Sequence, residues 1–145
     1  MLGESQVRLR ILLVEDNSID LRVAQQLLKK LGYTSVEPAA NGAEAVRLVE
    51  RQEFDVILMD VQMPEMNGYE ATQRIRAQEV ASGRHTPIIA LTAHAMKGDR
   101  ESCLSAGMDD YLSKPIQQRE LAAILERSSM AAGPLSEEVP ADHSV

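Results

Sequence analysis

The chain has 145 residues, a formal net charge of -7 at pH 7 and a sequence pI of about 5.0. This length is typical of one domain, which could bury roughly two thirds of the surface that its unfolded chain exposes. The acidic balance opposes direct binding to nucleic acid or to an anionic membrane, because there is no excess of Lys and Arg to displace counterions. We therefore expect the partners to be proteins or cations.

The cysteine and histidine content excludes two common kinds of small domain. The single cysteine, Cys103, cannot form an intrachain disulfide, and no Cys/His spacing matches a zinc site. Residues 1–10 lack the apolar stretch of a signal peptide, and no window approaches the roughly 20 apolar residues of a membrane span. We expect a soluble chain in the reducing cytoplasm that makes no membrane contact through this segment.

The first half of the chain alternates short apolar runs with segments of helical period. A strand is predicted over 10–15, followed by a helix that Asn17 or Ser18 caps and Gly32 ends. A short polar strand over 34–39 leads to a helix capped by Asn41. Its polarity is typical of a strand at the edge of a sheet.

The second half continues the same alternation. Continuous apolar runs over 54–59 and 87–92 predict strands that are buried on both faces. A helix over 69–80 and a turn over 82–86 separate them. The remaining predicted elements are a helix over 99–105, a strand over 110–113 and a last helix that ends near 127.

Five successive βα units predict an α/β fold, with a doubly wound, five-stranded parallel sheet covered by helices on both faces. The domain is expected over 9–127, after an N-terminal extension over 1–8. Residues 128–145 mix Ser, Ala, Pro, Gly and acids without a period. They are expected to form a flexible tail or linker, because they cannot bury enough apolar area to offset the entropy of ordering.

Polar residues stand at the carboxyl ends of four of the predicted strands. They are Glu15 and Asp16, Asp60, Thr92 and Lys114. In open parallel sheets these ends face one crevice, where ligands bind at the point at which the strand order reverses. A strand order of 2-1-3-4-5 would bring all these residues to one site.

The three acids predict a magnesium site. Carboxylates gathered in one crevice repel one another, which favours a bound cation or proton uptake. Oxygen ligands without histidine or thiolate favour Mg²⁺, which keeps several waters. Because Glu15 and Asp16 point to opposite sides of an ideal strand, we expect Asp16 to bind directly and the other acid to act through water.

The same residues could accept a phosphoryl group. A carboxylate can form an aspartyl phosphate where positive charge offsets the incoming oxygens. Asp60 is the candidate acceptor, Lys114 supplies a flexible point charge, and the small hydroxyl of Thr92 can donate to another phosphoryl oxygen.

Four segments together resemble the receiver domains of response regulators (the CheY-like fold), and more closely the receiver modules of hybrid sensor histidine kinases. The segments are ILLVEDN (11–17), FDVILMDVQMPEMNGYEA (54–71), PIIALTAHAM (87–96) and AGMDDYLSKPI (106–116). The resemblance implies that Asp60 is the phosphorylation site. It implies that Glu15 and Asp16 are the acidic pair and that the backbone carbonyl of Gln62 is a further Mg²⁺ ligand.

The resemblance also implies roles around the phosphoryl group. Thr92 and Lys114 would contact it as catalytic residues, and the peptide bond between Lys114 and Pro115 would be cis. On phosphorylation Thr92 would move inward and Tyr111 would turn into the vacated space, which changes the surface of the fourth helix, fifth strand and fifth helix. Without the resemblance, Tyr111 is a half-buried packing aromatic.

The partner implied is a sensor histidine kinase or a histidine phosphotransfer protein, and the chain would be a regulatory phospho-acceptor of a two-component phosphorelay. It would not be an enzyme, although it would assist its own phosphorylation and dephosphorylation. It would act in the cytoplasm, alone or as the cytoplasmic part of a membrane-bound hybrid kinase. The sequence leaves its oligomeric state open.

Two alternatives remain open. Asp60 could be the covalent nucleophile of a Mg²⁺-dependent phosphohydrolase, or the acidic pocket could persist in a binding module that is never phosphorylated. A nucleotide or flavin binder is disfavoured, because no G-x-G-x-x-G or P-loop pattern is present. Two further expectations are that His94 is a surface residue and that Asp109 and Asp110 form a solvated turn.

Overall fold

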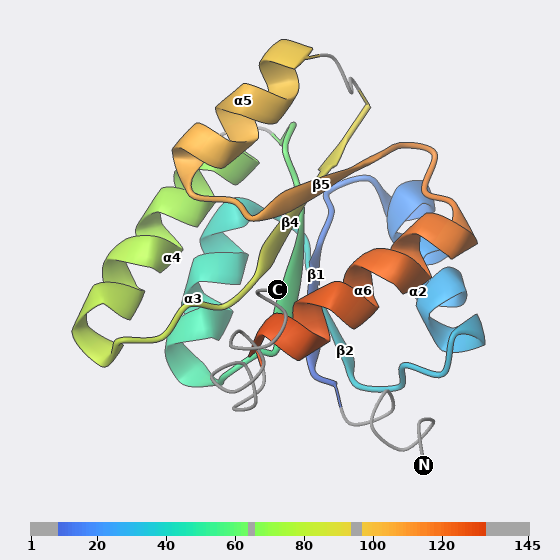
Figure 1. Ribbon diagram of the computed structural model, residues 1–145, viewed down its shortest axis with the longest axis horizontal. Coiled ribbons are helices and arrows are strands. Elements are labelled where there is room, and N and C mark those ends of the chain that lie inside the picture. The colour runs from blue at the N-terminus through green and yellow to red at the C-terminus, as the bar shows by residue number, and fades with distance from the viewer. Residues whose placement is uncertain (1–8, 64–65, 94–96, 133–145) are drawn as a thin grey trace, which may run out of the picture.

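Five parallel strands form one central sheet in the computed structural model, which describes residues 9–63, 66–93 and 97–132 (Figure 1). The strands are β1 (Ile11–Val14), β2 (Val36–Ala39), β3 (Val56–Asp60), β4 (Ile88–Thr92) and β5 (Asp110–Ser113). Their order is β2-β1-β3-β4-β5, which confirms the predicted order. The polar strand β2 lies at an edge of this sheet, where a proline such as Pro38 is tolerated.

Helices cover both faces of the sheet, as predicted. They are α2 (Ser18–Lys30), α3 (Gly42–Arg51), α4 (Gly68–Ser82), α5 (Lys97–Ala106) and α6 (Gln118–Ala132). Figure 1 shows α2 and α6 on one face and α3, α4 and α5 on the other. None of the helices in the described ranges is long and apolar enough to cross a membrane.

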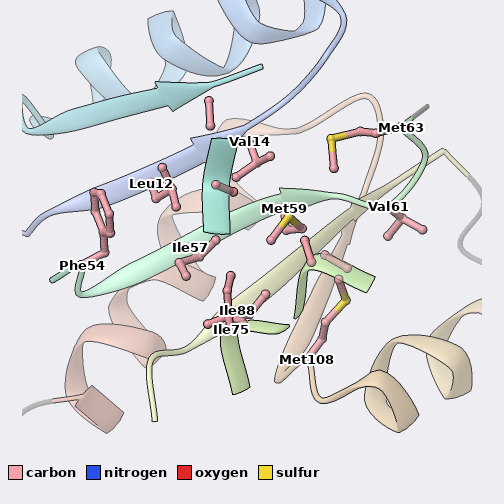
Figure 2. Close-up of a cluster of buried hydrophobic side chains, with 14 of the residues drawn as sticks. Leu12, Val14, Phe54, Ile57, Met59, Val61, Met63, Ile75, Ile88 and Met108 are labelled. Atoms are coloured by element: carbon pink, nitrogen blue, oxygen red, sulfur yellow. The ribbon is translucent and has the colours of Figure 1, made fainter. Parts of the chain in front are cut away.

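Alternate side chains of the central strands fill two separate cores. The core under α2 and α6 contains Ile11, Leu13, Val56, Leu58, Ile89 and Leu91. The core under α3, α4 and α5 (Figure 2) contains Leu12, Val14, Ile57, Met59, Ile88 and Ala90. Because successive side chains of a strand point to opposite faces, a continuous apolar run is needed to fill both cores.

Asparagine side chains begin three of the helices. Asn17, one of the two residues predicted to cap α2, precedes that helix, the predicted cap Asn41 precedes α3, and Asn67 precedes α4. Each accepts hydrogen bonds from backbone N–H groups of the first turn, which otherwise lack partners. In α4 the side chain of Glu70 also accepts from the Asn67 N–H, which completes a capping box.

The last helix extends beyond the predicted boundary at residue 127. The buried face of α6 contains Leu121, Ile124, Leu125 and then Ser128, at helical spacing. Apolar periodicity ends at Arg127, so it gave no sign that the polar Ser128 continues this face. Residues 128–132, expected in the flexible tail, are therefore helical, whereas 1–8 and 133–145 lie outside the described residues.

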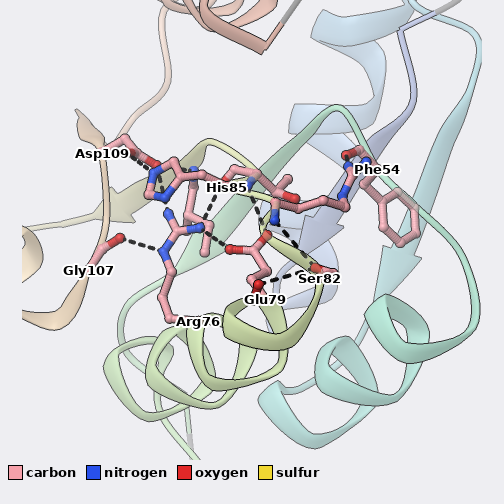
Figure 3. Close-up of polar contacts among 10 residues, drawn as sticks. Phe54, Arg76, Glu79, Ser82, His85, Gly107 and Asp109 are labelled. Atoms are coloured by element: carbon pink, nitrogen blue, oxygen red, sulfur yellow. Dashed lines mark hydrogen bonds and ion pairs between the residues drawn. The ribbon is translucent and has the colours of Figure 1, made fainter.

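A half-buried arginine, Arg76, joins α4 to the amino end of the sheet (Figure 3). Arg76 donates from Nε to the Gly107 carbonyl at 2.9 Å and from Nη1 to the Thr86 carbonyl at 2.8 Å. The same Nη1 lies 2.7 Å from Oε1 of the buried Glu79, whose Oε2 accepts from the Thr86 N–H. The charged pair therefore has the hydrogen bonds that burial requires.

Asp109 completes this network. Its Oδ2 accepts from Arg76 Nη2 and from the Ile88 N–H, both at 2.8 Å, and its Oδ1 lies 2.7 Å from His85 Nε2. The expectation of a solvated turn is thus incomplete for Asp109, and Asp110 is the first residue of β5. The partners of Asp109 are distant in sequence, so local composition could not reveal them.

Candidate functional site

Three carboxylates meet at the carboxyl end of the sheet. Glu15 and Asp16 follow β1, and Asp60 ends β3, which pairs with β1 in the register Val14 to Met59. One carboxylate oxygen from each acid lies within 4.8 Å of the others. Glu15 and Asp60 are only 3% and 4% exposed, whereas Asp16 is exposed. The structure therefore brings together the three acids that the sequence analysis selected.

Lys114 places its ammonium group among these acids. Its Nζ lies 2.9 Å from Glu15 Oε1, 3.5 Å from Asp60 Oδ1 and 3.3 Å from Asp20 Oδ2. The Lys114–Pro115 peptide bond is cis, the isomer that the resemblance implied. The backbone N–H of Lys114 donates to the Thr92 carbonyl at 2.8 Å, which joins the ends of β4 and β5.

Burial and like charge make Asp60 a weak acid in this site. Burial, followed by the hydrogen bond and the negative charge of Glu15, raises the pKa of Asp60 from 3.8 to about 7, although Lys114 and the Gln62 N–H oppose the shift. Burial alone would lower the pKa of Lys114, but the surrounding carboxylates outweigh it and raise that pKa. The site therefore has more negative charge than one ammonium group can compensate.

Backbone donors fix the two buried carboxylates. The Gln62 N–H donates to Asp60 Oδ1 at 3.2 Å, and the Asn17 N–H donates to Glu15 Oε2 at 3.3 Å. The Gln62 side chain is exposed, so this residue meets the site through its main chain. Both donors belong to the loops that follow β1 and β3.

The two residues expected to act as a switch lie on neighbouring strands. Thr92 ends β4 and is 3% exposed, one position beyond Leu91, the register partner of Asp60. Tyr111 is half-buried in β5 beside Ala90, and its ring packs against the core under α3, α4 and α5. His94, which flanks the site in the sequence, lies outside the described residues.

Asp20 is a residue of the site that the sequence analysis missed. It lies in the first turn of α2, where an acid is usual because it interacts favourably with the helix dipole. Its contact with Lys114 joins segments far apart in the chain. The available signal was its place one helical turn after Asp16, on the helix that starts at the site.

The donor set fits a hard divalent cation. Three carboxylates within 4.8 Å supply oxygen ligands only. Burial of Asp60, followed by the hydrogen bond and negative charge of Glu15, raises its pKa, so a positive charge bound here would be favourable. Mg²⁺ prefers such ligands and needs few of them. Glu15, Asp16 and Asp60 are therefore the residues that could hold it.

Comparison with known proteins agrees with this arrangement. The family model of the response regulator receiver domain matches residues 11–126. The sensor protein GacS of Pseudomonas syringae pv. syringae is 47% identical over 117 residues, which cover 80% of this chain and 13% of GacS. The chain thus spans only a small part of that relative.

Two solved structures share the fold and much of the sequence. The receiver domain of the sensor histidine kinase PA1611 from Pseudomonas aeruginosa PAO1, with a magnesium ion coordinated in its active-site cleft, is 54% identical with a TM-score of 0.76, covering 83% of this chain and 97% of that one. A chain in the co-crystal structure of the Saccharomyces cerevisiae phosphotransfer protein Ypd1 with the receiver domain of Ssk1 is 34% identical with a TM-score of 0.77, covering 87% and 92%. This chain belongs to the family of response regulator receiver domains.

Proposed function

We propose that this receiver domain is the phospho-acceptor of a two-component phosphorelay and that Asp60 takes the phosphoryl group from a phosphohistidine. The observation that carries the proposal is the position of the Asp60 carboxylate at the end of β3. It lies 3.5 Å from the Lys114 ammonium and within 4.8 Å of the other two acids. A nucleophile and the positive charge that its product needs are therefore side by side.

In the transfer, an Asp60 carboxylate oxygen forms a bond to phosphorus in line with the departing nitrogen. The P–N bond of the phosphohistidine breaks, and its electron pair goes to the imidazole, which takes up a proton. Lys114 has three N–H donors for the phosphoryl oxygens, and the Thr92 hydroxyl can donate one more. Asp60 must be ionised to react, so positive charge that lowers its pKa promotes the step.

Magnesium fits this chemistry. Asp16, Asp60 and the carbonyl of Gln62 would hold the ion, with Glu15 acting through water. When bound, the ion supplies positive charge that offsets the carboxylates and the phosphoryl oxygens. The magnesium ion in the cleft of the PA1611 receiver domain supports the assignment.

The product would act as a signal and not as a step in metabolism, so we propose a regulatory protein and not an enzyme. Thr92 and Tyr111 would couple the site to the surface of α5, β5 and α6. Their positions on adjacent strands support this coupling, because a shift of Thr92 would displace the β5 residues that pair with it. The ring of Tyr111 is half-buried, so it can change its packing only when neighbouring residues move.

Relatives indicate the kind of partner. GacS is a sensor protein, and Ssk1 was crystallised with the histidine phosphotransfer protein Ypd1. We propose that the donor here is a sensor histidine kinase or a histidine phosphotransfer protein. The chain would work in the cytoplasm, on its own or as one module of a hybrid kinase, without direct contact with nucleic acid or membrane.

Intact-mass measurement tests the proposal. Incubation with acetyl phosphate and Mg²⁺ should add the mass of one phosphoryl group to the chain, and Asp60→Asn should abolish the addition. Asp55→Asn is the matched control, because Asp55 lies just before the same strand at its opposite end and bonds the Arg10 N–H. It should be labelled like the wild type, and labelling of Asp60→Asn would refute the assignment.

Two other measurements address the alternatives and the partner. Multiple-turnover hydrolysis of an aryl phosphate that Asp60→Ala abolishes would favour the phosphohydrolase. Partner binding that is indifferent to Asp60→Asn would favour the unphosphorylated binding module. Timed phosphotransfer from a set of histidine kinases and phosphotransfer proteins would identify the donor.

A further inference from the structure

The carboxylate of Asp20 provides Lys114 with a partner that lies apart from the predicted metal ligands. Asp20 Oδ2 is 3.3 Å from Lys114 Nζ, and the Asp20 side chain is 45% exposed against 17% for Lys114. The contact therefore lies at the rim of the site, on the solvent side of the ammonium group. Glu15 and Asp60, the other partners of Lys114, are both buried.

Helix capping does not account for this orientation. Asp20, Glu44 and Glu70 occupy the same position, third in the helix, after an asparagine cap. Glu44 accepts from the Ala40 N–H and Glu70 from its own cap, so both turn back onto the main chain before the helix. The Asp20 carboxylate instead bonds the side chain of Lys114.

In α2 the backbone group at the cap is already satisfied. The Asn17 N–H donates to Glu15 Oε2, which takes the place that a capping acid would fill. Asp20 therefore does not need to accept a backbone hydrogen bond at the cap, as Glu44 and Glu70 do in α3 and α4. The sequence of the loop after β1 thus leaves one carboxylate free to face Lys114.

Occupation of the acidic cluster by a cation would change the partners of Lys114. The cluster consists of Glu15, Asp16 and Asp60, and it does not include Asp20. A cation bound there would repel the Lys114 ammonium. It would also attract Glu15 and Asp60, which are two of the three carboxylate partners of Lys114. Asp20 is then the partner that remains available to keep Lys114 beside the site.

We propose that Asp20 is a positioning residue for Lys114, which it holds at the rim of the acidic site until Lys114 exchanges the Asp20 carboxylate for a phosphoryl oxygen. The inference rests on the proposed function of Asp60 and deepens it. Asp20 favours the resting, cation-loaded site and opposes the phosphorylated one, since it competes with the phosphoryl group for the same ammonium. No bond of Asp20 itself forms or breaks in the transfer.

Asp20→Asn should therefore act in opposite directions on the two states. Without the Asp20 carboxylate, Lys114 would pair only with Glu15 and Asp60 and would compete with Mg²⁺ for them. The Kd for Mg²⁺ measured by calorimetry should therefore rise by about threefold. At saturating Mg²⁺ the freed ammonium should hold the phosphoryl group better, so the aspartyl phosphate should last about threefold longer by intact mass. Glu70→Gln, at the same helical position in α4, is the matched control and should change neither quantity.

A double-mutant cycle separates positioning from the simple loss of a charge. In a Lys114→Ala background the Asp20→Asn change should alter the Kd for Mg²⁺ by less than about 1.5-fold at 0.15 M ionic strength, where an exposed charge is screened. An equal effect in both backgrounds would overturn the proposal. So would an unchanged Kd in the single variant.

The two proposals can fail separately. If the wild-type chain takes no phosphoryl group from acetyl phosphate or from any donor, the proposed function fails. The calorimetric cycle needs no phosphorylation, so it still decides whether Asp20 holds Lys114. If labelling is normal and the lifetime is unchanged in Asp20→Asn, the exchange is wrong while the function of Asp60 stands.

Discussion

Gly68 lies against the main chain of Asp60. A Cβ atom at position 68 would overlap the Asp60 carbonyl oxygen and would lie 2.9 Å from Val61 Cα. The Gly68 N–H donates to the Val61 carbonyl at 3.0 Å, so the start of α4 is bonded to the loop that carries the acceptor. Gly68, the first residue of α4, therefore helps to set the position of the Asp60 main chain.

Gly68→Ala should displace this loop, because the atoms that the new methyl group meets are backbone and cannot rotate away. We expect a loss of about 2 kcal/mol or more in the free energy of unfolding, and slower labelling by acetyl phosphate. Gly83→Ala is the control. Gly83 has a φ of 75° but open space where a Cβ would lie, so Gly83→Ala should lose about 1 kcal/mol with normal labelling. Equal labelling in both variants would contradict the link between Gly68 and Asp60.

Lys114→Ala should keep the fold and impair the chemistry. Its ammonium lies 2.9 Å from Oε1 of the buried Glu15 and 3.5 Å from Oδ1 of the buried Asp60. Phosphoryl transfer should slow by about tenfold or more, whereas the circular dichroism spectrum should not change. Lys29→Ala, an exposed lysine in the last turn of α2, should transfer normally. A variant that is labelled at the wild-type rate would remove Lys114 from the mechanism.

Arg76→Leu should destabilise the protein without a direct effect on the site. The change leaves the buried Glu79 and the Thr86 carbonyl without their guanidinium partner, at the opposite end of the sheet from Asp60. Urea denaturation should show a loss of about 3 kcal/mol. The exposed Arg74 of the same helix is the control, and Arg74→Leu should stay within about 0.5 kcal/mol. A loss no larger than that of the control would show that the network is not stabilising.

The sequence was informative where one local pattern determined the structure. Continuous apolar runs predicted β3 and β4, and the polar run before Asn41 predicted the edge strand. Once the strands were known, the geometry of a parallel sheet was enough to bring Glu15, Asp60 and Lys114 together. The site was therefore predictable because its residues stand at strand ends.

Other features depend on pairs that no local pattern connects. Asp20 has the ordinary composition of a helix start, and only the fold brings it to Lys114. Asp109 has the composition of a turn, but its partners are Arg76 and His85 from another part of the chain. The end of α6 was missed because the polar Ser128 occupies a buried position.

Removal of Mg²⁺ should block labelling, because the carboxylates would then repel the incoming phosphate. Excess EDTA should abolish the gain in mass from acetyl phosphate, and restored Mg²⁺ should recover it. Mg²⁺ at about 100 times its Kd should also stabilise the fold by about 2.7 kcal/mol. A matched ionic strength of NaCl is the control and should give no such rise in Tm. Efficient labelling in EDTA would contradict the role of the metal.

The raised pKa of Asp60 predicts how stability depends on pH when Mg²⁺ is absent. The folded carboxyl keeps its proton up to a pKa of about 7, whereas the unfolded one loses it near the ordinary value of 3.8. Between these values the folded state binds more protons, so the stability contributed by this group is complete at low pH and is lost as pH rises through about 7. Above that pH the buried charge opposes folding.

Asp60→Asn cannot titrate, so the variant should gain stability relative to the wild type as pH rises. In EDTA, urea denaturation should show a difference that is larger at pH 8 than at pH 5 by roughly 1 to 2 kcal/mol, since solvent and Lys114 offset part of the cost. Asp55→Asn, at the other end of the strand, is the matched control for the loss of one carboxylate. If the difference in the free energy of unfolding between Asp60→Asn and the wild type is the same at both pH values, burial and Glu15 do not raise the pKa of Asp60. The physical basis for a cation at this site is then lost.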